Sequence, residues 1–152
     1  MSKETIKFKK LSDNVKSPTY ATNGSNCVDL VATHFIGSES SEMVIEPGEK
    51  VMIGTGIAIE LPVGKAALIF ARSGLASKKG LAPANKVGVI DSDYRGELIV
   101  ALRNYSNNTE VVSLGERVAQ LGIIDMPQYI FEEVSELSDT DRGLDGFGST
   151  GN

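Results

Sequence analysis

The chain has 152 residues, a formal net charge of −5 at pH 7 and 41% hydrophobic residues, which fits one domain with an ordinary core. The acidic balance argues against stable non-specific binding to nucleic-acid phosphates, so an anion site must be a local cluster of arginine, backbone N–H groups and metal. No stretch approaches the roughly 20 apolar residues of a membrane span, and the charged start is unlike a signal peptide. We expect an intracellular protein, cytoplasmic or, if the source is eukaryotic or viral, nuclear, that binds neither nucleic acid nor membrane.

Cysteine and histidine offer little chemistry. Cys27 is the only cysteine, so it cannot form an intramolecular disulfide, and no Cys/His cluster has the spacing of a zinc site. We interpret it as a packed thiol. His34 is the only histidine, and any Ser-His-Asp or Cys-His mechanism would need it. We interpret His34 as a strand or loop residue without a catalytic role.

Short apolar runs separated by turn residues dominate the chain, and a spacing of about 8–12 residues is typical of a β-sandwich or barrel. The alternation of Leu98, Val100 and Leu102 is a clear strand signal, because successive side chains of a strand point to opposite faces. The runs predict strands at 6–10, 28–32, 44–45, 51–53, 57–61, 66–70, 87–90, 98–104, 111–112 and 118–124. The fold is therefore predicted to be all-β, with a polar loop at 16–26 and at most one short helix, at 72–79.

The last segment differs from the rest of the chain. After Leu137 the only large apolar residues are Leu144 and Phe147, while the last ten residues contain four glycines. Such a segment cannot offset its ordering entropy alone, so we expect a mobile C-terminal arm. Its glycines let backbone N–H groups approach an anion closely, although the composition also fits a disordered terminus without a role.

Three polar segments carry candidate chemistry. The triplet 72–74 (Arg-Ser-Gly) follows a strand and could open a helix, which would present a guanidinium, a hydroxyl and N–H groups to a phosphate; such triplets are also ordinary turns. The turn at 91–95 (Asp-Ser-Asp-Tyr-Arg) offers a carboxylate that could activate water near a bound phosphate, or could simply hydrogen-bond the turn. Arg117 and Gln120 are three positions apart in a predicted strand, so we expect them to point to opposite faces and one of them to be structural.

Together, five segments resemble the five motifs of the trimeric dUTP pyrophosphatase family. These segments are 25–32 (SNCVDLVA), 71–76 (ARSGLA), 85–97 (NKVGVIDSDYRGE), 115–122 (GERVAQLG) and 142–151 (RGLDGFGSTG). Their order and spacing agree with the family over almost the whole chain. Departures occur at Cys27, Val28, Ala71, Leu144 and Asp145; they leave the residues with assigned chemistry in place and bear on affinity and arm closure.

The resemblance implies a fold and an assembly. The fold is a distorted jelly roll or β-barrel of the β-clip type, and the assembly is a homotrimer whose active sites are shared between subunits. Residues 1–136 would form the catalytic β-barrel domain. Residues 137–152 would form a flexible, Gly-rich arm that closes over a neighbouring active site.

The resemblance also implies a reaction, the Mg²⁺-dependent hydrolysis of dUTP to dUMP and pyrophosphate by attack of water on the α-phosphate. This reaction limits uracil in DNA and supplies dUMP for dTMP synthesis. Asp91 would hold and deprotonate the water, Tyr94 would pack on the deoxyribose and exclude a 2′-hydroxyl, and Asp29 would support Mg²⁺ through water. The other implied substrate-binding residues are Asn85, Gly88, Val89 and Ile90 for uracil, Arg72, Ser73, Gly74 and Gln120 for the phosphates, and Arg142, Phe147, Gly148, Ser149 and Thr150 on the arm, where Phe147 would stack on uracil.

Three other readings compete with this one. A dCTP deaminase shares the fold, but the Asp91–Asp93 turn and Tyr94 favour hydrolysis at phosphorus. A nucleotide-sensing or partner-binding module could keep the fold and lose turnover, but the presence of Asp91, Arg142 and Phe147 argues against pure loss. A structural trimer would leave the C-terminal motif unexplained.

Overall fold

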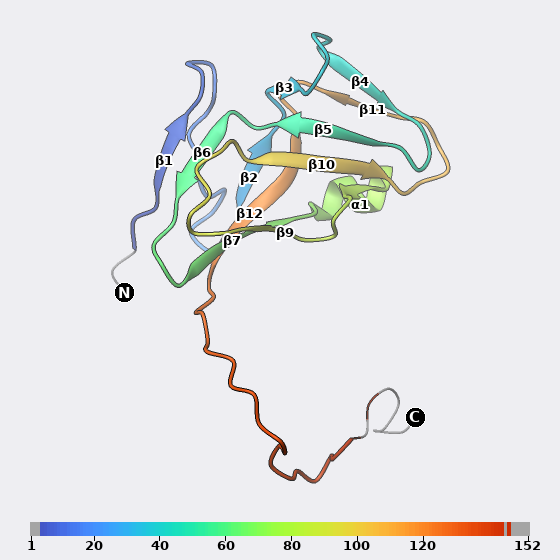
Figure 1. Cartoon of the computed structure of the whole chain (residues 1–152). Coiled ribbons are helices and arrows are strands. Elements are labelled where there is room, and N and C mark those ends of the chain that lie inside the picture. Colours follow the sequence, from blue (N-terminus) through green and yellow to red (C-terminus); the bar gives the residue numbers. More distant parts are fainter. Residues whose placement is uncertain (1–3, 145, 147–152) are drawn as a thin grey trace.

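The computed structural model of the chain describes residues 4–144 and 146, which contain twelve β-strands and one α-helix (Figure 1). The strands are β1 (Lys7–Lys10), β2 (Val28–Val31), β3 (His34–Phe35), β4 (Glu42–Ile45), β5 (Lys50–Gly54), β6 (Ile57–Glu60), β7 (Lys65–Phe70), β8 (Leu81–Pro83), β9 (Gly88–Ile90), β10 (Ile99–Asn104), β11 (Glu110–Ser113) and β12 (Arg117–Asp125). The helix is α1 (Ser73–Lys79). The all-β architecture with one short helix is confirmed.

The strands form two four-stranded sheets and two strand pairs, all antiparallel, and no sheet closes on itself in the described part of the chain. One large sheet has the order β2-β12-β7-β9 and the other β3-β5-β10-β8, while β1 pairs with β6 and β11 with β4. The body is therefore an open jelly-roll-like fold (Figure 1). Strands β2 and β9, which carry predicted site residues, lie at the two edges of one sheet.

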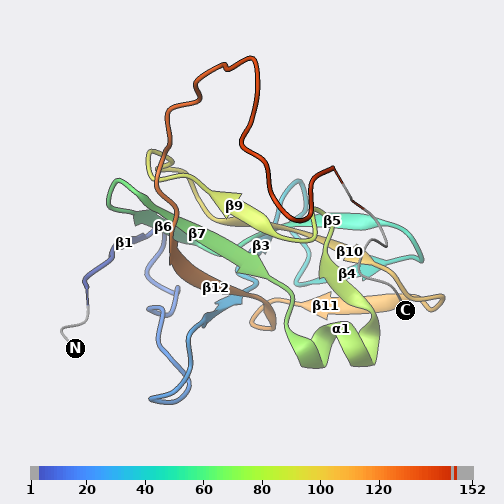
Figure 2. The ribbon, with the colours of Figure 1, turned by 90° about the horizontal axis from the view of Figure 1, so that it is seen from below.

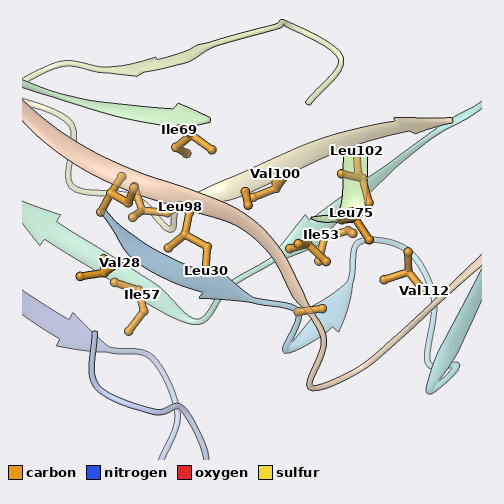
Figure 3. Packing of buried hydrophobic residues seen from close by; sticks show 14 of the residues in the cluster. Val28, Leu30, Ile53, Ile57, Ile69, Leu75, Leu98, Val100, Leu102 and Val112 are labelled. Atoms are coloured by element: carbon orange, nitrogen blue, oxygen red, sulfur yellow. The ribbon is translucent and has the colours of Figure 1, made fainter. Parts of the chain in front are cut away.

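The hydrophobic core lies between the two large sheets. Ile53 of β5 and Val100 of β10 are buried from one sheet, and Leu30 of β2 and Ile69 of β7 are buried from the other (Figure 3). Burial of each such side chain contributes about 1.5–3 kcal/mol. The core thereby fixes strands whose polar ends form the candidate site.

The sequence pattern predicts most strands but not all. Leu98, Val100 and Leu102 are all buried, as their alternation predicts. Strands β3 and β8 were not predicted, because β3 has two residues and β8 ends in Pro83, which lacks a backbone N–H.

Helix α1 ends where the chain turns back toward β8. Gly80 adopts the left-handed conformation, with φ 65°, and its N–H donates to the carbonyl oxygen of Ala76 at 3.0 Å. Lys79 Nζ donates to the carbonyl oxygen of Val111 at 3.0 Å, so α1 contacts β11 at the edge of the body (Figure 2). No helix in residues 4–144 is long and apolar enough to cross a membrane.

The chain leaves the body at the end of β12 and runs away from it (Figure 1). Lys65 anchors this exit, with Nζ 2.6 Å from Asp125 Oδ1 and 2.8 Å from Glu4 Oε2. Hydrogen bonds to Asp125 and then Glu4 raise the pKa of Lys65 to about 12. Beyond Asp125 the described residues form no helix or strand.

Candidate active site

A hollow of about 360 Å³ lies where β2, β12 and the end of β7 meet, and we call it the arginine pocket. Gln120 of β12 pairs with Asp29 of β2 on one side and with Phe70 of β7 on the other, so the sheet brings three motifs together. The lining residues are the predicted Asp29, Arg72, Ser73 and Gln120 and, in addition, Ala21, Ser25, Asn26, Cys27 and Arg117. Pairing across the sheet therefore gathers four of the predicted residues in one place.

Asp29 bridges two arginines in this pocket. Its Oδ1 lies 2.7 Å from Arg72 Nε, and its Oδ2 lies 3.2 Å from Arg117 Nη1. The Asp29 and Arg72 side chains are 27% and 24% exposed, so water screens their contact only in part. Two guanidinium groups against one carboxylate leave a net positive charge, which suits an anionic ligand.

A β-bulge places Arg117 and Gln120 on the same side of β12, and the expectation of opposite faces is wrong. Arg117 pairs with Val31 and Ala119 with Leu30, so β12 has one more residue than β2 over this interval. The extra residue shifts the alternation by one position. Both Arg117 and Gln120 consequently line the arginine pocket.

The start of α1 forms another wall of the arginine pocket. Arg72 precedes the helix in an extended conformation, φ −88° and ψ 130°, and Gln120 Nε2 donates to the carbonyl oxygen of Ala71 at 2.9 Å. Ser73 lines the pocket, whereas Gly74 is exposed on the first turn and does not line it. The first N–H groups of a helix have no partner within the helix and suit an anion.

The segment predicted as a uracil-binding hairpin is instead a tight turn that joins two sheets, because β8 pairs with β10 and β9 pairs with β7. Lys86 has a left-handed φ of 67°, and the N–H of Val87 donates to the carbonyl oxygen of Asn85 at 2.8 Å. A Cβ atom at Gly88 would lie 3.2 Å from Ile69 Cβ and 3.3 Å from Asn85 Nδ2. The turn therefore holds the Asn85 amide close to Gly88, where an added Cβ atom would be in tight contact with Ile69 and Asn85.

A second hollow, of about 200 Å³, lies after β9, and we call it the tyrosine pocket. Its lining residues are Val89, Ile90, Asp91, Tyr94, Glu97 and Ile99. The N–H of Tyr94 donates to the carbonyl oxygen of Asp91 at 3.2 Å, and the Tyr94 hydroxyl donates to the carbonyl oxygen of Glu97 at 2.9 Å. The turn thus places an exposed carboxylate beside a fixed aromatic ring.

The two pockets lie at opposite ends of β7 and share no lining residue. Ile90 pairs with Ala67, so Asp91 is level with Ala66, whereas Arg72 follows the other end of the strand. At about 3.3 Å per extended residue, the six positions from Ala66 to Arg72 separate the two backbones by about 20 Å. A single chain therefore does not bring Asp91 next to Arg72.

The predicted arm residues are only partly described. Arg142 lies in an exposed turn in which the N–H of Gly143 donates to the carbonyl oxygen of Thr140 at 3.0 Å. The predicted residues Phe147, Gly148, Ser149 and Thr150 lie outside the described residues.

The described residues suit a hydrated metal ion better than a ligand cage. No three His, Cys, Asp or Glu side chains in residues 4–144 are grouped so that they could hold a metal ion. Asp29 is the carboxylate of the arginine pocket, and each of its oxygens retains acceptor capacity beyond its arginine contact. Mg²⁺ usually keeps several waters and binds substrate phosphates, so Asp29 fits an ion that it contacts through water.

Comparison with known proteins identifies the family. A sequence profile of the dUTPase family matches residues 13–151. The chain belongs to the dUTPase family. This family member is 53% identical over 139 residues to a deoxyuridine 5′-triphosphate nucleotidohydrolase of Desulfitobacterium hafniense. The aligned residues cover 90% of this chain and 87% of that protein. The chain is 46% identical over 143 residues to the protein of the same name from Hydrogenobaculum sp., with coverage of 94% and 95%.

Solved structures of dUTPases have the same fold as this family member. A mutant dUTPase of Staphylococcus bacteriophage 80alpha with dUpNHpp matches with a TM-score of 0.84 at 27% identity, over 99% of this chain and 100% of that chain. A mutant dUTPase from phage phi11 of S. aureus matches with a TM-score of 0.74 at 23% identity, over 88% and 98%.

Two residues of the site were given no role by sequence reasoning. Arg117 lies in the fourth motif, but its place in the arginine pocket depends on the bulge in β12. Glu97 closes the third motif, and its role depends on contacts with segments more than 40 positions earlier in the chain. Both residues belong to motifs, but the motifs do not indicate which residues they contact.

Proposed function

We propose that this dUTPase family member hydrolyses dUTP to dUMP and pyrophosphate. The observation that supports the proposal most strongly is the pair of pockets at the ends of β7: one has the charge for a triphosphate, and the other has the carboxylate and ring for a sugar and an attacking water. The names of the relatives, deoxyuridine 5′-triphosphate nucleotidohydrolases, agree with this chemistry.

The arginine pocket would bind the phosphates. Arg72 presents a guanidinium held by Asp29, while Ser73 and Gly74 present the first N–H groups of α1 and a hydroxyl. Gln120 would support the same groups, because its amide already fixes the carbonyl of Ala71. Arg117 adds a second guanidinium, which contacts the other oxygen of the Asp29 carboxylate.

Mg²⁺ would accompany the triphosphate. A triphosphate carries roughly four negative charges, and each unit-charge contact at 4 Å is worth only about 4 kcal/mol at an effective dielectric constant of 20. The ion would reduce the charge on the phosphate oxygens when it is bound. Asp29 would hold its water shell, which is why we assign this carboxylate two tasks, the orientation of the arginines and the support of the ion.

The turn before β9 and the tyrosine pocket would select the nucleoside. Asn85 and the backbone from Gly88 through Val89 to Ile90 offer fixed donors and acceptors to the uracil edge, so a mismatched base would leave buried polar groups unpaired. Tyr94 would lie flat against the deoxyribose. A 2′-hydroxyl would then meet the ring without a hydrogen-bond partner.

Asp91 would act as the general base. Its carboxylate is exposed at the mouth of the tyrosine pocket, where it can accept a proton from a water molecule. The water oxygen would form a bond to the α-phosphorus as the bond from that phosphorus to the bridging oxygen breaks. Pyrophosphate leaves with the bonding electrons, and the proton remains on Asp91 until solvent removes it.

A homotrimer with shared sites would bring together the two pockets, which are far apart within one chain. About 20 Å of backbone separates Asp91 from Arg72 in one chain, and a shared site would bring Asp91 of one copy close to Arg72 of another. Exposed apolar side chains also support an assembly, since Ile130 and Phe131 are 97% and 98% exposed in the described chain. Large exposed apolar groups are typical of an interface with a second copy.

The arm at 137–152 would close over the site after the substrate binds. Arg142, Ser149 and Thr150 would contact the terminal phosphate, Gly148 would allow close approach, and Phe147 would stack on uracil. Stacking of an aromatic side chain on a base is worth roughly 1–3 kcal/mol. Closure would exclude water, which strengthens every remaining ionic contact. In the cell the reaction would limit uracil in DNA and supply dUMP for dTMP synthesis.

The experiment that tests the function is pyrophosphate release from dUTP, dCTP, dTTP and UTP, each with Mg²⁺ or with EDTA. We expect fast release from dUTP with Mg²⁺ and release slower by at least about a hundredfold from the others. Ammonia release from dCTP would replace the proposal with deamination, and binding of dUTP without turnover would replace it with nucleotide sensing.

A further inference from the structure

The side chain of Glu97 joins two segments that are distant in the sequence. Its Oε1 accepts the backbone N–H of Gly56 at 2.6 Å, and its Oε2 lies 3.5 Å from His34 Nε2. The side chain is 16% exposed, so a carboxylate at this depth needs such partners. Glu97 also lines the tyrosine pocket, although sequence reasoning assigned it no role.

His34 is held against Gly54 by its neighbour Thr33. The Thr33 hydroxyl donates to the carbonyl oxygen of Gly54 at 2.9 Å. His34 Nδ1 lies 3.1 Å from Thr33 Oγ1, so the ring lies between Thr33 and Glu97. A Cβ atom at Gly54 would lie 2.0 Å from the imidazole ring, so only glycine leaves room for His34 at this position.

The contacts of Glu97 help to fix the peptide group between Glu97 and Leu98. On one side of this peptide the N–H of Leu98 donates to the carbonyl oxygen of Ile57 at 2.8 Å. On the other side the carbonyl of Glu97 accepts the Tyr94 hydroxyl at 2.9 Å. The position of the Tyr94 ring therefore depends on how firmly residues 97 and 98 are held to the segment at 54–57.

The absence of a side chain at Gly96 leaves room for the Tyr94 ring. A Cβ atom there would lie 2.4 Å from the Tyr94 hydroxyl oxygen and 2.6 Å from the ring carbon that bears it. The ring thus lies directly over Gly96 with its hydroxyl directed to Glu97. Without the anchored peptide, an exposed turn would leave this ring free to rotate.

We propose that Glu97 and His34 are positioning residues that hold the wall of the tyrosine pocket and thereby set how strongly the site rejects a ribonucleotide. Glu97 fixes the peptide that receives the Tyr94 hydroxyl, and His34 steadies the carboxylate of Glu97. The inference rests on the proposed function, because it needs the Tyr94 ring to face the sugar of dUTP.

The test is a set of variants compared for KM and kcat with dUTP and with UTP. Glu97→Ala raises the KM for dUTP and lowers the preference for dUTP over UTP, each about tenfold, while kcat changes less than about threefold, as loss of one positioning hydrogen bond predicts. Glu97→Gln retains an oxygen acceptor for Gly56 and restores both values to within about twofold. His34→Ala gives a smaller change, about twofold, because its side chain is 47% exposed.

Two controls separate positioning from general damage to the fold. Glu49→Ala removes a carboxylate that also accepts a backbone N–H, that of Glu46 at 3.1 Å, at an exposed turn outside both pockets, and leaves KM and selectivity unchanged. In a Tyr94→Phe background, Glu97→Ala adds little, because both changes break the same link. Equal effects of Glu49→Ala and Glu97→Ala, or additive effects of Glu97→Ala and Tyr94→Phe, would overturn the inference.

A readout without nucleotide keeps the inference distinct from the proposed function. The chain has four tyrosines, and 3-fluorotyrosine labelling gives a ¹⁹F resonance for Tyr94 that Tyr94→Phe identifies. Glu97→Ala shifts or broadens that resonance, and Glu49→Ala does not. An unchanged resonance contradicts the positioning role even if dUTP is hydrolysed; a shifted resonance in a chain that does not hydrolyse dUTP contradicts only the proposed function.

Discussion

The arginine pocket and the tyrosine pocket hold their functional groups by different means. In the arginine pocket, charged side chains position one another, since Asp29 contacts both Arg72 and Arg117. In the tyrosine pocket, the backbone positions the side chain, since Tyr94 lies over Gly96 and bonds a peptide carbonyl. The difference indicates that changes of charge should affect phosphate binding, whereas changes of backbone space should affect sugar selection.

The largest effect is expected from Asp91→Asn. Asparagine keeps the shape of the turn but cannot accept the proton of the attacking water, so turnover falls by about 10²–10⁴-fold. Binding of dUpNHpp, measured by calorimetry, stays within about threefold because the phosphates contact the other pocket. Turnover comparable to that of the unaltered chain would remove Asp91 from its assigned role.

Removal of residues 140–152 should have the next largest effect. The core cluster of the described chain ends at Ile123 and its last strand ends at Asp125, so we expect the oligomer to persist in light scattering. Pyrophosphate release falls by about a hundredfold, because an open site leaves water around the phosphates. Normal activity of the shortened chain is the outcome that excludes a closing arm.

Asp29→Asn should weaken phosphate binding without changing the nucleoside preference. An amide oxygen can accept from one arginine but lacks the charge that orients both, so the KM for dUTP rises about tenfold. The ratio of dUTP to UTP activity stays constant, which separates the two pockets. Asp13→Asn, an exposed carboxylate that lines neither pocket, is the matched control.

Gly96→Ala should have a smaller effect, on the nucleoside preference and not on phosphate binding. The added methyl group meets the Tyr94 hydroxyl and displaces the ring, so the preference for dUTP over UTP falls about threefold to fivefold. Affinity for inorganic pyrophosphate, measured by calorimetry, is unchanged because the arginine pocket is intact. A change in pyrophosphate affinity with no change in nucleoside preference would reverse the assignment of the pockets.

The sequence predicts the strands because alternation and turn residues are local properties. Ile53, Leu98 and Val100 are buried as their patterns require, and the helix after Arg72 forms where the sequence allows one. The motif residues Asp29 and Gln120 pair across β2 and β12 and line the same pocket, which the sequence did not predict.

The remaining features depend on pairing between distant strands. The bulge that turns Arg117 toward Gln120 exists only in the register of β12 against β2, which no periodicity of β12 reveals. The separation of Asp91 from Arg72 follows from the antiparallel pairing of β7 with β9. The motifs alone do not show this separation, because it arises only when β9 pairs with β7 and the two residues come to lie near opposite ends of β7.

Mixing two defective chains tests the shared site most directly. Arg72→Met and Asp91→Asn each inactivate one half of the site, and the two variants are co-expressed or refolded together at equal amounts. If each site takes Asp91 from one copy and Arg72 from another, random assembly restores about a quarter of the sites, and pyrophosphate release from dUTP rises to about that fraction of the normal rate. Activity that stays at the sum of the two separate variants would contradict a site built from more than one chain.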